Sequence, residues 1–192
     1  MLRYTSGLAG AGSADMQVLW FDAVGPDLAG LTSGRLIGAV MRVFSTGTVG
    51  LRAPDPLEDP QVDVALLSDP RDGVRLRECV HRIRAILRHS DVEAIATSIA
   101  TVGAELDDLD SDDAVDEWLG ATVNDYVHAV GTCRMGAPGD PAAVVDPDCR
   151  VRDYRALRVC DASVMPSAPR ANTHLSAIAV AEVLLTRIAA TA

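Results

Sequence analysis

Residues 156–163 of the chain read ALRVCDAS, and residues 172–182 read NTHLSAIAVAE. We expect residues 157–160 to form a short buried strand of a parallel sheet. The second stretch opens a segment, from about residue 173 to residue 190, that is apolar on most sides, so we expect a helix enclosed by other structure. Asn172 is the expected N-cap of this helix, because an asparagine side chain can accept a hydrogen bond from the first turn.

The first third of the chain has the patterns of antiparallel β-structure. Residues 16–23 read MQVLWFDA, which predicts a largely buried strand that ends before Gly25 and Pro26. Residues 36–51 are β-prone and are interrupted by the turn-forming sequence STGT at residues 45–48, so we expect a hairpin there. Residues 61–65 alternate between polar and apolar side chains and predict a further strand.

The middle of the chain is predicted to be helical. Asp69 and Pro70 supply the capping and first-turn chemistry of a helix start. Apolar residues then recur at helical spacing and predict one buried face, made of Leu76, Val80, Ile83 and Leu87. We expect the opposite face to be solvated, with an anionic partner as the alternative. That face carries Arg71, Arg75, Arg77, Arg82, Arg84 and Arg88. Two further helices are predicted at residues 92–99 and 114–123.

The composition excludes several classes of chemistry. The 192 residues include 17 arginines and no lysine, which excludes Schiff-base, phosphate-loop and general-base lysines. A net charge of −10 argues against nucleic-acid or anionic-membrane partners. Much of the acidity lies at residues 105–117, which we interpret as a solvated surface segment because it lacks the glycine and terminal glutamate of a calcium-binding loop.

The cysteines and the hydropathy indicate the compartment. The four cysteines form no CxxC pair, the first thirty residues contain no signal-peptide segment, and no eighteen apolar residues run together. We therefore expect a reduced, cytoplasmic location without a membrane segment. The histidine and cysteine spacing lacks the closely paired ligands of structural zinc sites, so no metal site is predicted.

Two histidines are the candidates for catalysis. His128 precedes a glycine-threonine turn, and His174 lies at the start of the terminal helix. A histidine can take a hydroxyl proton, and a helix N-terminus stabilises a developing anion. The pair suits oxidation of an alcohol with hydride transfer to a cofactor, although either histidine taken alone is more often structural. A serine hydrolase is disfavoured because no G-x-S-x-G motif occurs.

These segments resemble the C-terminal signature of the glucose-methanol-choline (GMC) flavin oxidoreductases. The resemblance rests on HAVGTCRMG at residues 128–136, LRVCDAS at 157–163 and NTH at 172–174, in the family's order and spacing. Upstream, GTVGL at 47–51 and PQVD at 60–63 resemble its substrate-domain strand and following turn. The likeness covers most of the chain from about residue 15.

The resemblance implies an α+β fold in two parts. Residues 1–126 would form an antiparallel sheet with helices that roofs the substrate site. Residues 127–192 would supply the last strand and helix of an FAD-binding α/β domain together with the catalytic motifs.

The resemblance also implies FAD-dependent oxidation of a small-molecule alcohol. His128 matches the catalytic histidine, which takes the hydroxyl proton while the substrate carbon gives its hydride to the flavin. His174 matches the second active-site position, which orients the substrate oxygen. The residues expected to contact the cofactor are Asp161, Ala162, Asn172, Thr173 and His174.

One element of the family pattern does not occur in the chain. The G-x-G-x-x-G fingerprint, which holds the ADP half of FAD, is absent from residues 1–192. The sequence thus resembles the C-terminal third of a member, and we expect weak FAD binding or none unless a flavin-binding part, for example a separate chain, completes it. A non-catalytic remnant or interaction module stays open as an alternative, as does a flavin-containing lyase. The sequence specifies neither the alcohol nor the electron acceptor.

Overall fold

The structure is a computed structural model that describes residues 1–190, and it contains two compact units. The first comprises Met1–Thr46 and Ala65–Asn124, and the second comprises Gly47–Val64 and Asp125–Ala192. The α+β character with antiparallel sheets and helices is confirmed. The sequence placed residues 47–64 with the first part, whereas in the structure they belong to the second unit, where they pair with themselves as a hairpin.

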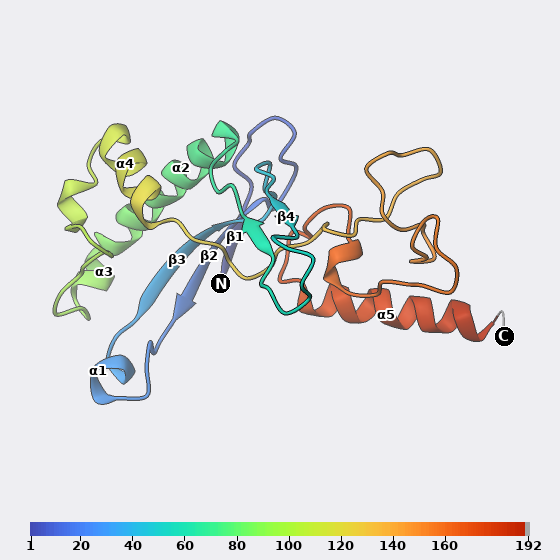
Figure 1. The fold of residues 1–192 in the computed structure, drawn as a ribbon. Coiled ribbons are helices and arrows are strands. Elements are labelled where there is room, and N and C mark those ends of the chain that lie inside the picture. The colour runs from blue at the N-terminus through green and yellow to red at the C-terminus, as the bar shows by residue number, and fades with distance from the viewer. Residues whose placement is uncertain (191–192) are drawn as a thin grey trace. The chain divides into compact units, whose positions relative to one another are not determined.

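A three-stranded antiparallel sheet organises the first unit. Its strands are β1 Leu2–Tyr4, β2 Met16–Phe21 and β3 Arg35–Val40, in the order β1-β2-β3. The predicted strand is confirmed as β2, but only its first half is buried, because Trp20 near its end is 70% exposed. The short helix α1 Leu28–Leu31 lies in the connection between β2 and β3 (Figure 1).

The predicted hairpin at residues 36–51 is wrong. β3 pairs with β2, with Val40 opposite Met16, and ends there. β4 Thr48–Gly50 pairs instead with β5 Gln61–Asp63. The turn-forming residues between β3 and β4 were visible in the sequence, but pairing partners are decided by longer-range contacts that a local turn signal does not contain.

The helices of the first unit begin at the expected caps. α2 Pro70–Leu87 is confirmed, and the Asp69 side chain accepts a hydrogen bond from the Arg71 backbone N at 3.0 Å. α4 Asp112–Thr122 is also confirmed, and the acidic residues around its start are exposed, as expected. The helix predicted at residues 92–99 is wrong, because only α3 Ser90–Glu93 forms. Ile95 is 82% exposed, so a longer helix has no buried face to stabilise it.

Helix α2 connects two apolar clusters. The helix lies beside the sheet (Figure 1), and its residues Cys79 and Ile83 pack with Met16 and Val18. Leu76 and Val80 pack on a second cluster, which is centred on Leu109, Val115 and Leu119 next to the 3₁₀ helix η1 Leu106–Asp108. The predicted apolar face of α2 is therefore packed but only partly buried, and it is shared between two neighbours.

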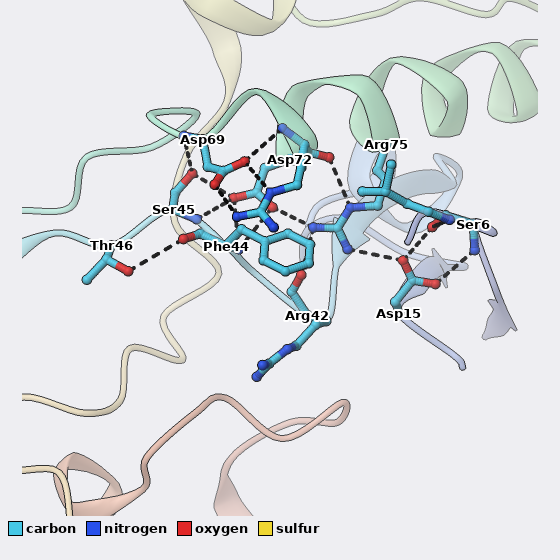
Figure 2. Close-up of polar contacts among 11 residues, drawn as sticks. Ser6, Asp15, Arg42, Phe44, Ser45, Thr46, Asp69, Asp72 and Arg75 are labelled. Atoms are coloured by element: carbon cyan, nitrogen blue, oxygen red, sulfur yellow. Dashed lines mark hydrogen bonds and ion pairs between the residues drawn. The ribbon is translucent and has the colours of Figure 1, made fainter. Parts of the chain in front are cut away.

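Arg75 departs from the solvated face predicted for α2. Arg75 is 1% exposed, and its guanidinium forms ion pairs with Asp15 Oδ2 at 3.1 Å and with Asp72 Oδ1 at 2.5 Å (Figure 2). It also donates to the Arg42 carbonyl at 2.7 Å. Asp72 in turn accepts from the backbone N of Ser45 at 2.7 Å. A buried arginine requires partners of this kind, so the expectation of a fully solvated arginine face is wrong at this position.

Gly38 of β3 allows α2 to approach the sheet closely. A Cβ built at Gly38 lies 2.6 Å from Cys79 Sγ and 3.3 Å from Ile83 Cδ1. We expect Gly38→Ala to lower the free energy of unfolding, measured in urea, by about 1–3 kcal/mol, because the buried thiol must move. Cys79→Ala should lower the free energy of unfolding less in the Gly38→Ala variant than in the parent, since it removes the sulfur that the new Cβ would meet. Strict additivity of the two changes would exclude this contact as the cause.

The second unit packs α5 His174–Ala189 against an irregular chain (Figure 1). Its core consists of Val145, Cys149, Val164 and Leu184, with Val180 and Ile188 of α5 packed against it. A short 3₁₀ helix, η2 Ala162–Val164, lies before α5. Arg187 of α5 pairs with Asp148 at 3.1 Å.

Two expectations for this unit are corrected. The predicted terminal helix forms, but it is not enclosed by residues 1–190, because Leu175 is 75% exposed and Leu185 is 61% exposed. The strand predicted at residues 157–160 is reduced to an isolated antiparallel bridge between Arg150 and Arg158, and Leu157 is 47% exposed. A parallel strand needs a neighbouring strand, and the described part of the chain provides none at this position. No helix of residues 1–190 is long and apolar enough to cross a membrane.

Candidate active site

His128 lies in the second unit, just after the chain returns from the first. Its ring is partly buried, and the Tyr126 ring meets it edge-on, with centroids 5.0 Å apart and planes at 84°. Between these residues, Val127 has a φ of +50°, which is rare for a β-branched side chain. Such a backbone conformation is costly for a valine, and it marks the segment next to His128 as locally strained.

Thr173 connects His128 to the start of α5. The Thr173 hydroxyl lies 2.9 Å from His128 Nδ1, and Thr173 is only 9% exposed. Among residues 1–190, no hydrogen bond to the other ring nitrogen, Nε2, is found. The imidazole is thus held at one nitrogen and open at the other.

The N-terminus of α5 is the second part of the site. The N-cap is Thr173 and not the predicted Asn172, and the Thr173 side chain makes no capping hydrogen bond to the first turn. The Thr173 hydroxyl contacts His128 instead. The first backbone N–H groups of α5 therefore remain available to an acceptor, at the end of the helix that carries positive partial charge. His174 is the first residue of α5 and is exposed.

Backbone hydrogen bonds join the two motif segments. Cys133 N donates to the Ser163 carbonyl at 3.0 Å, and Met135 N donates to the Val164 carbonyl at 2.8 Å. Gly131 begins this contact with a φ of +90°, which favours glycine. A Cβ at Gly131 would lie 3.4 Å from the Met165 carbonyl oxygen. These hydrogen bonds therefore hold the HAVGTCRMG motif beside the turn at residues 161–165.

Asp161 forms the turn that the sequence singled out. It is the N-cap of η2, and its Oδ1 accepts from the Ser163 backbone N at 2.8 Å and from the Ser163 hydroxyl. Both bonds use the same carboxylate oxygen, and Asp161 itself is exposed. None of the contacts found among residues 1–190 joins Asp161 or Ala162 to either histidine.

The structure therefore brings together part of the predicted site. His128 and Thr173 touch, and His174 follows Thr173 directly, whereas Asp161 and Ala162 are linked to the same unit through the backbone of residues 133–135. The contacts of Thr173 and Tyr126 with His128 were not predicted. No sequence signal pointed to Tyr126, and Thr173 was expected to contact the cofactor and not His128. Among residues 1–190, no group of three or more histidine, cysteine or acidic residues could hold a metal ion.

The chain is similar to a known protein family and to several known proteins. A family model described as GMC oxidoreductase matches residues 43–181. The 5-(hydroxymethyl)furfural oxidase of a Methylovorus species is 36% identical over 191 residues, which is 94% of this chain and 35% of that protein. The oxygen-dependent choline dehydrogenase of Photobacterium profundum is 33% identical over 138 residues, which is 72% of this chain and 24% of that protein.

A solved structure is also similar to this chain. The crystal structure of pyridoxine 4-oxidase from "Mesorbium loti" is similar with a TM-score of 0.78 and 27% identity, over 92% of this chain and 34% of that one. The chain thus spans between about a quarter and a third of the length of the proteins it resembles.

Proposed function

Because the chain belongs to the GMC oxidoreductase family, we propose that it carries the catalytic residues of an FAD-dependent alcohol oxidation. The observation that carries this proposal is the pairing of His128 with the start of α5. One imidazole nitrogen, Nδ1, lies 2.9 Å from the Thr173 hydroxyl. Thr173 is also the N-cap of α5, where its side chain makes no capping hydrogen bond. A base and a site for a developing negative charge are the two groups that removal of a hydride from an alcohol requires.

His128 takes the role of general base. Its Nε2 accepts the hydroxyl proton of the alcohol as the carbon–hydrogen bond breaks. His174, the first residue of α5, donates a hydrogen bond to the substrate oxygen and orients it. Tyr126 packs on the edge of the His128 ring and limits its rotation.

The residues of the second unit fit FAD, the cofactor that the family implies. When bound, the flavin accepts the hydride of the alcohol. The free N–H groups of the first turn of α5 suit the carbonyl oxygens of the flavin pyrimidine ring, and the helix dipole favours the negative charge that follows reduction. The proposed contact residues are Asp161, Ala162, Asn172, Thr173 and His174.

The two parts of the chain take different roles in this proposal. The part up to about residue 126 contributes the roof of the substrate site, and residues 127–192 contribute the end of the flavin domain. Since the chain contains no G-x-G-x-x-G fingerprint, the ADP half of FAD is held by a further part of the family fold, in the same polypeptide or in another. The activity is proposed for the assembly of both parts.

A chimera tests the function. This chain replaces the matching third of the 5-(hydroxymethyl)furfural oxidase relative, with which it aligns over 191 residues. The protein is loaded with FAD and mixed anaerobically with primary, aryl and choline-like alcohols. We expect loss of the oxidised flavin absorbance with at least one alcohol, followed by reoxidation with oxygen or with an artificial acceptor.

The alternatives give different results in the same experiment. A flavin that stays oxidised while product forms would indicate a lyase. A chimera that folds and binds FAD but reacts with no alcohol would contradict the proposed oxidation and favour a non-catalytic module. The 192-residue chain alone, measured in parallel, shows whether it retains flavin without the added part.

A further inference from the structure

We propose that Thr173 fixes the tautomer of His128, so that Nδ1 carries the proton and Nε2 presents its lone pair. Thr173 is then a positioning residue for the imidazole. The inference rests on the proposed function, because the choice of Nδ1 over Nε2 follows from the use of Nε2 as a base, and the NMR experiment below tests the tautomer separately from the activity.

The geometry limits what can hold the ring. The Thr173 hydroxyl lies 2.9 Å from His128 Nδ1, and Thr173 is 9% exposed. Among residues 1–190, no other polar group is found within hydrogen-bonding distance of the ring, and Tyr126 meets it only edge-on. In a histidine, the hydrogen bond at one nitrogen decides which nitrogen carries the proton. Thr173 is therefore the described side chain that can bias the tautomer, in the direction in which its hydroxyl bonds Nδ1.

The direction of this hydrogen bond follows from both charge states of the ring. A hydroxyl can donate or accept. When Nε2 gains a proton, both ring nitrogens carry hydrogen, and Nδ1 can then only donate to the Thr173 oxygen. If Nδ1 already donates in the neutral ring, proton uptake at Nε2 requires no rearrangement. The opposite direction would leave a proton on Nε2, which would then be unable to accept one.

The location of Thr173 explains why its oxygen is available. As the N-cap of α5 it makes no side-chain hydrogen bond to its own helix. A threonine at this position ordinarily accepts from the first turn. Here the same oxygen faces His128, and the capping interaction is replaced by a contact across 45 residues of sequence.

Nitrogen-15 NMR of the full chain tests the tautomer directly. The chain contains four histidines, so each ring can be assigned by single substitution. At a pH where the imidazole is neutral, we expect His128 to show a protonated Nδ1 and an unprotonated Nε2. Thr173→Val, which keeps the shape and removes the hydroxyl, should move the population toward a protonated Nε2. Thr173→Ser should restore the parent spectrum.

A matched control separates the contact from general effects. Thr186→Val is the same substitution in α5, at a hydroxyl that contacts the Glu182 carbonyl. It should leave the His128 signals unchanged. A protonated Nε2 in the parent chain, or the same His128 tautomer in Thr173→Val as in the parent, would overturn the proposal.

Kinetics of the chimera provide a second readout. Thr173→Val should lower kcat for flavin reduction about 10–100-fold with little change in KM, by analogy with the partners that orient metal-bound histidines. Thr173→Ser should recover most of the rate. If NMR finds the expected tautomer but the parent chimera oxidises no alcohol, the inference on Thr173 stands and the proposed function fails.

Discussion

Replacing His128 by alanine is expected to lower the rate constant for flavin reduction by alcohol about 10²–10⁴-fold in the chimera, since a positioned general base contributes a factor of this size. The measurement is anaerobic stopped-flow reduction of the bound flavin at saturating alcohol. The large effect follows from the open Nε2 of a ring that Thr173 holds at 2.9 Å through Nδ1. FAD content must be measured in the same samples, so that loss of cofactor is not counted as loss of base.

The control for this variant is His89→Ala in the first unit. His89 is exposed and caps the short helix α3. The chimera with His89→Ala should show flavin reduction at the parent rate. Imidazole added to His128→Ala should recover part of the activity, because the missing group is a base. An unchanged rate in His128→Ala would contradict the assignment, and the search for a base would then move to His174.

The parts of the fold that were predictable are those with a local signal. α2 could be placed because its apolar residues recur at helical spacing after the cap at Asp69, and α5 because its segment is apolar on most sides. β2 was visible as an apolar run. The pairing of β4 with β5, by contrast, joins residues separated by a proline-rich loop, and no pattern within residues 36–51 distinguishes this partner from β3.

The site shows the same division. The motif containing His128 and the position of His174 were visible in the sequence, since both lie next to element ends. The bond between His128 and Thr173 was not, because it joins residues 45 positions apart. A residue type alone does not reveal which of its neighbours in the fold it will meet.

The exposed side of α5 illustrates how the environment of a predicted element can differ. Its apolar character correctly predicted a helix, but Leu175 and Leu185 remain exposed in the unit formed by the described residues. The enclosure expected for α5 is therefore not found within residues 1–190.

The second large effect is expected at Arg75, where the sequence was misleading. Six arginines fall on one side of α2, and only burial distinguishes Arg75 from the rest. Arg75→Met should lower the free energy of unfolding by about 3–5 kcal/mol, because it leaves two buried carboxylates, Asp15 and Asp72, without their cation. Such a loss is a large fraction of the roughly 5–15 kcal/mol that stabilises a typical domain. Urea unfolding at pH 7 measures it.

The loss should also depend on pH, and its sign follows from Asp15. Burial favours the neutral carboxyl, but hydrogen bonds from Ser6 and Arg75 outweigh it and hold the pKa of Asp15 below its ordinary value of 3.8. A carboxyl with a lowered folded-state pKa stabilises the fold above its unfolded pKa, and this stability is lost as the pH falls through the folded pKa. Without Arg75 the pKa of Asp15 should rise, so the variant is penalised at pH 7 and the penalty is relieved on acidification. The difference between parent and variant should therefore shrink as the pH falls toward roughly 4.

Arg88→Met is the matched control, with the same substitution at the C-terminal end of the same helix. The Arg88 side chain is 48% exposed and pairs with an Asp107 side chain that is 86% exposed, so its loss should cost about 0–1 kcal/mol. Combining Arg75→Met with Asp15→Asn should cost less than the sum of the two, since the neutral amide no longer needs a cation. Equal losses for Arg75→Met and Arg88→Met, without any pH dependence, would show that burial adds nothing to this ion pair. A large loss confined to Arg75 would instead show that its buried ion pairs stabilise the first unit. The same network joins α2 to Asp15 and to the backbone of Phe44 and Ser45, just before the chain leaves the first unit after Thr46 (Figure 2).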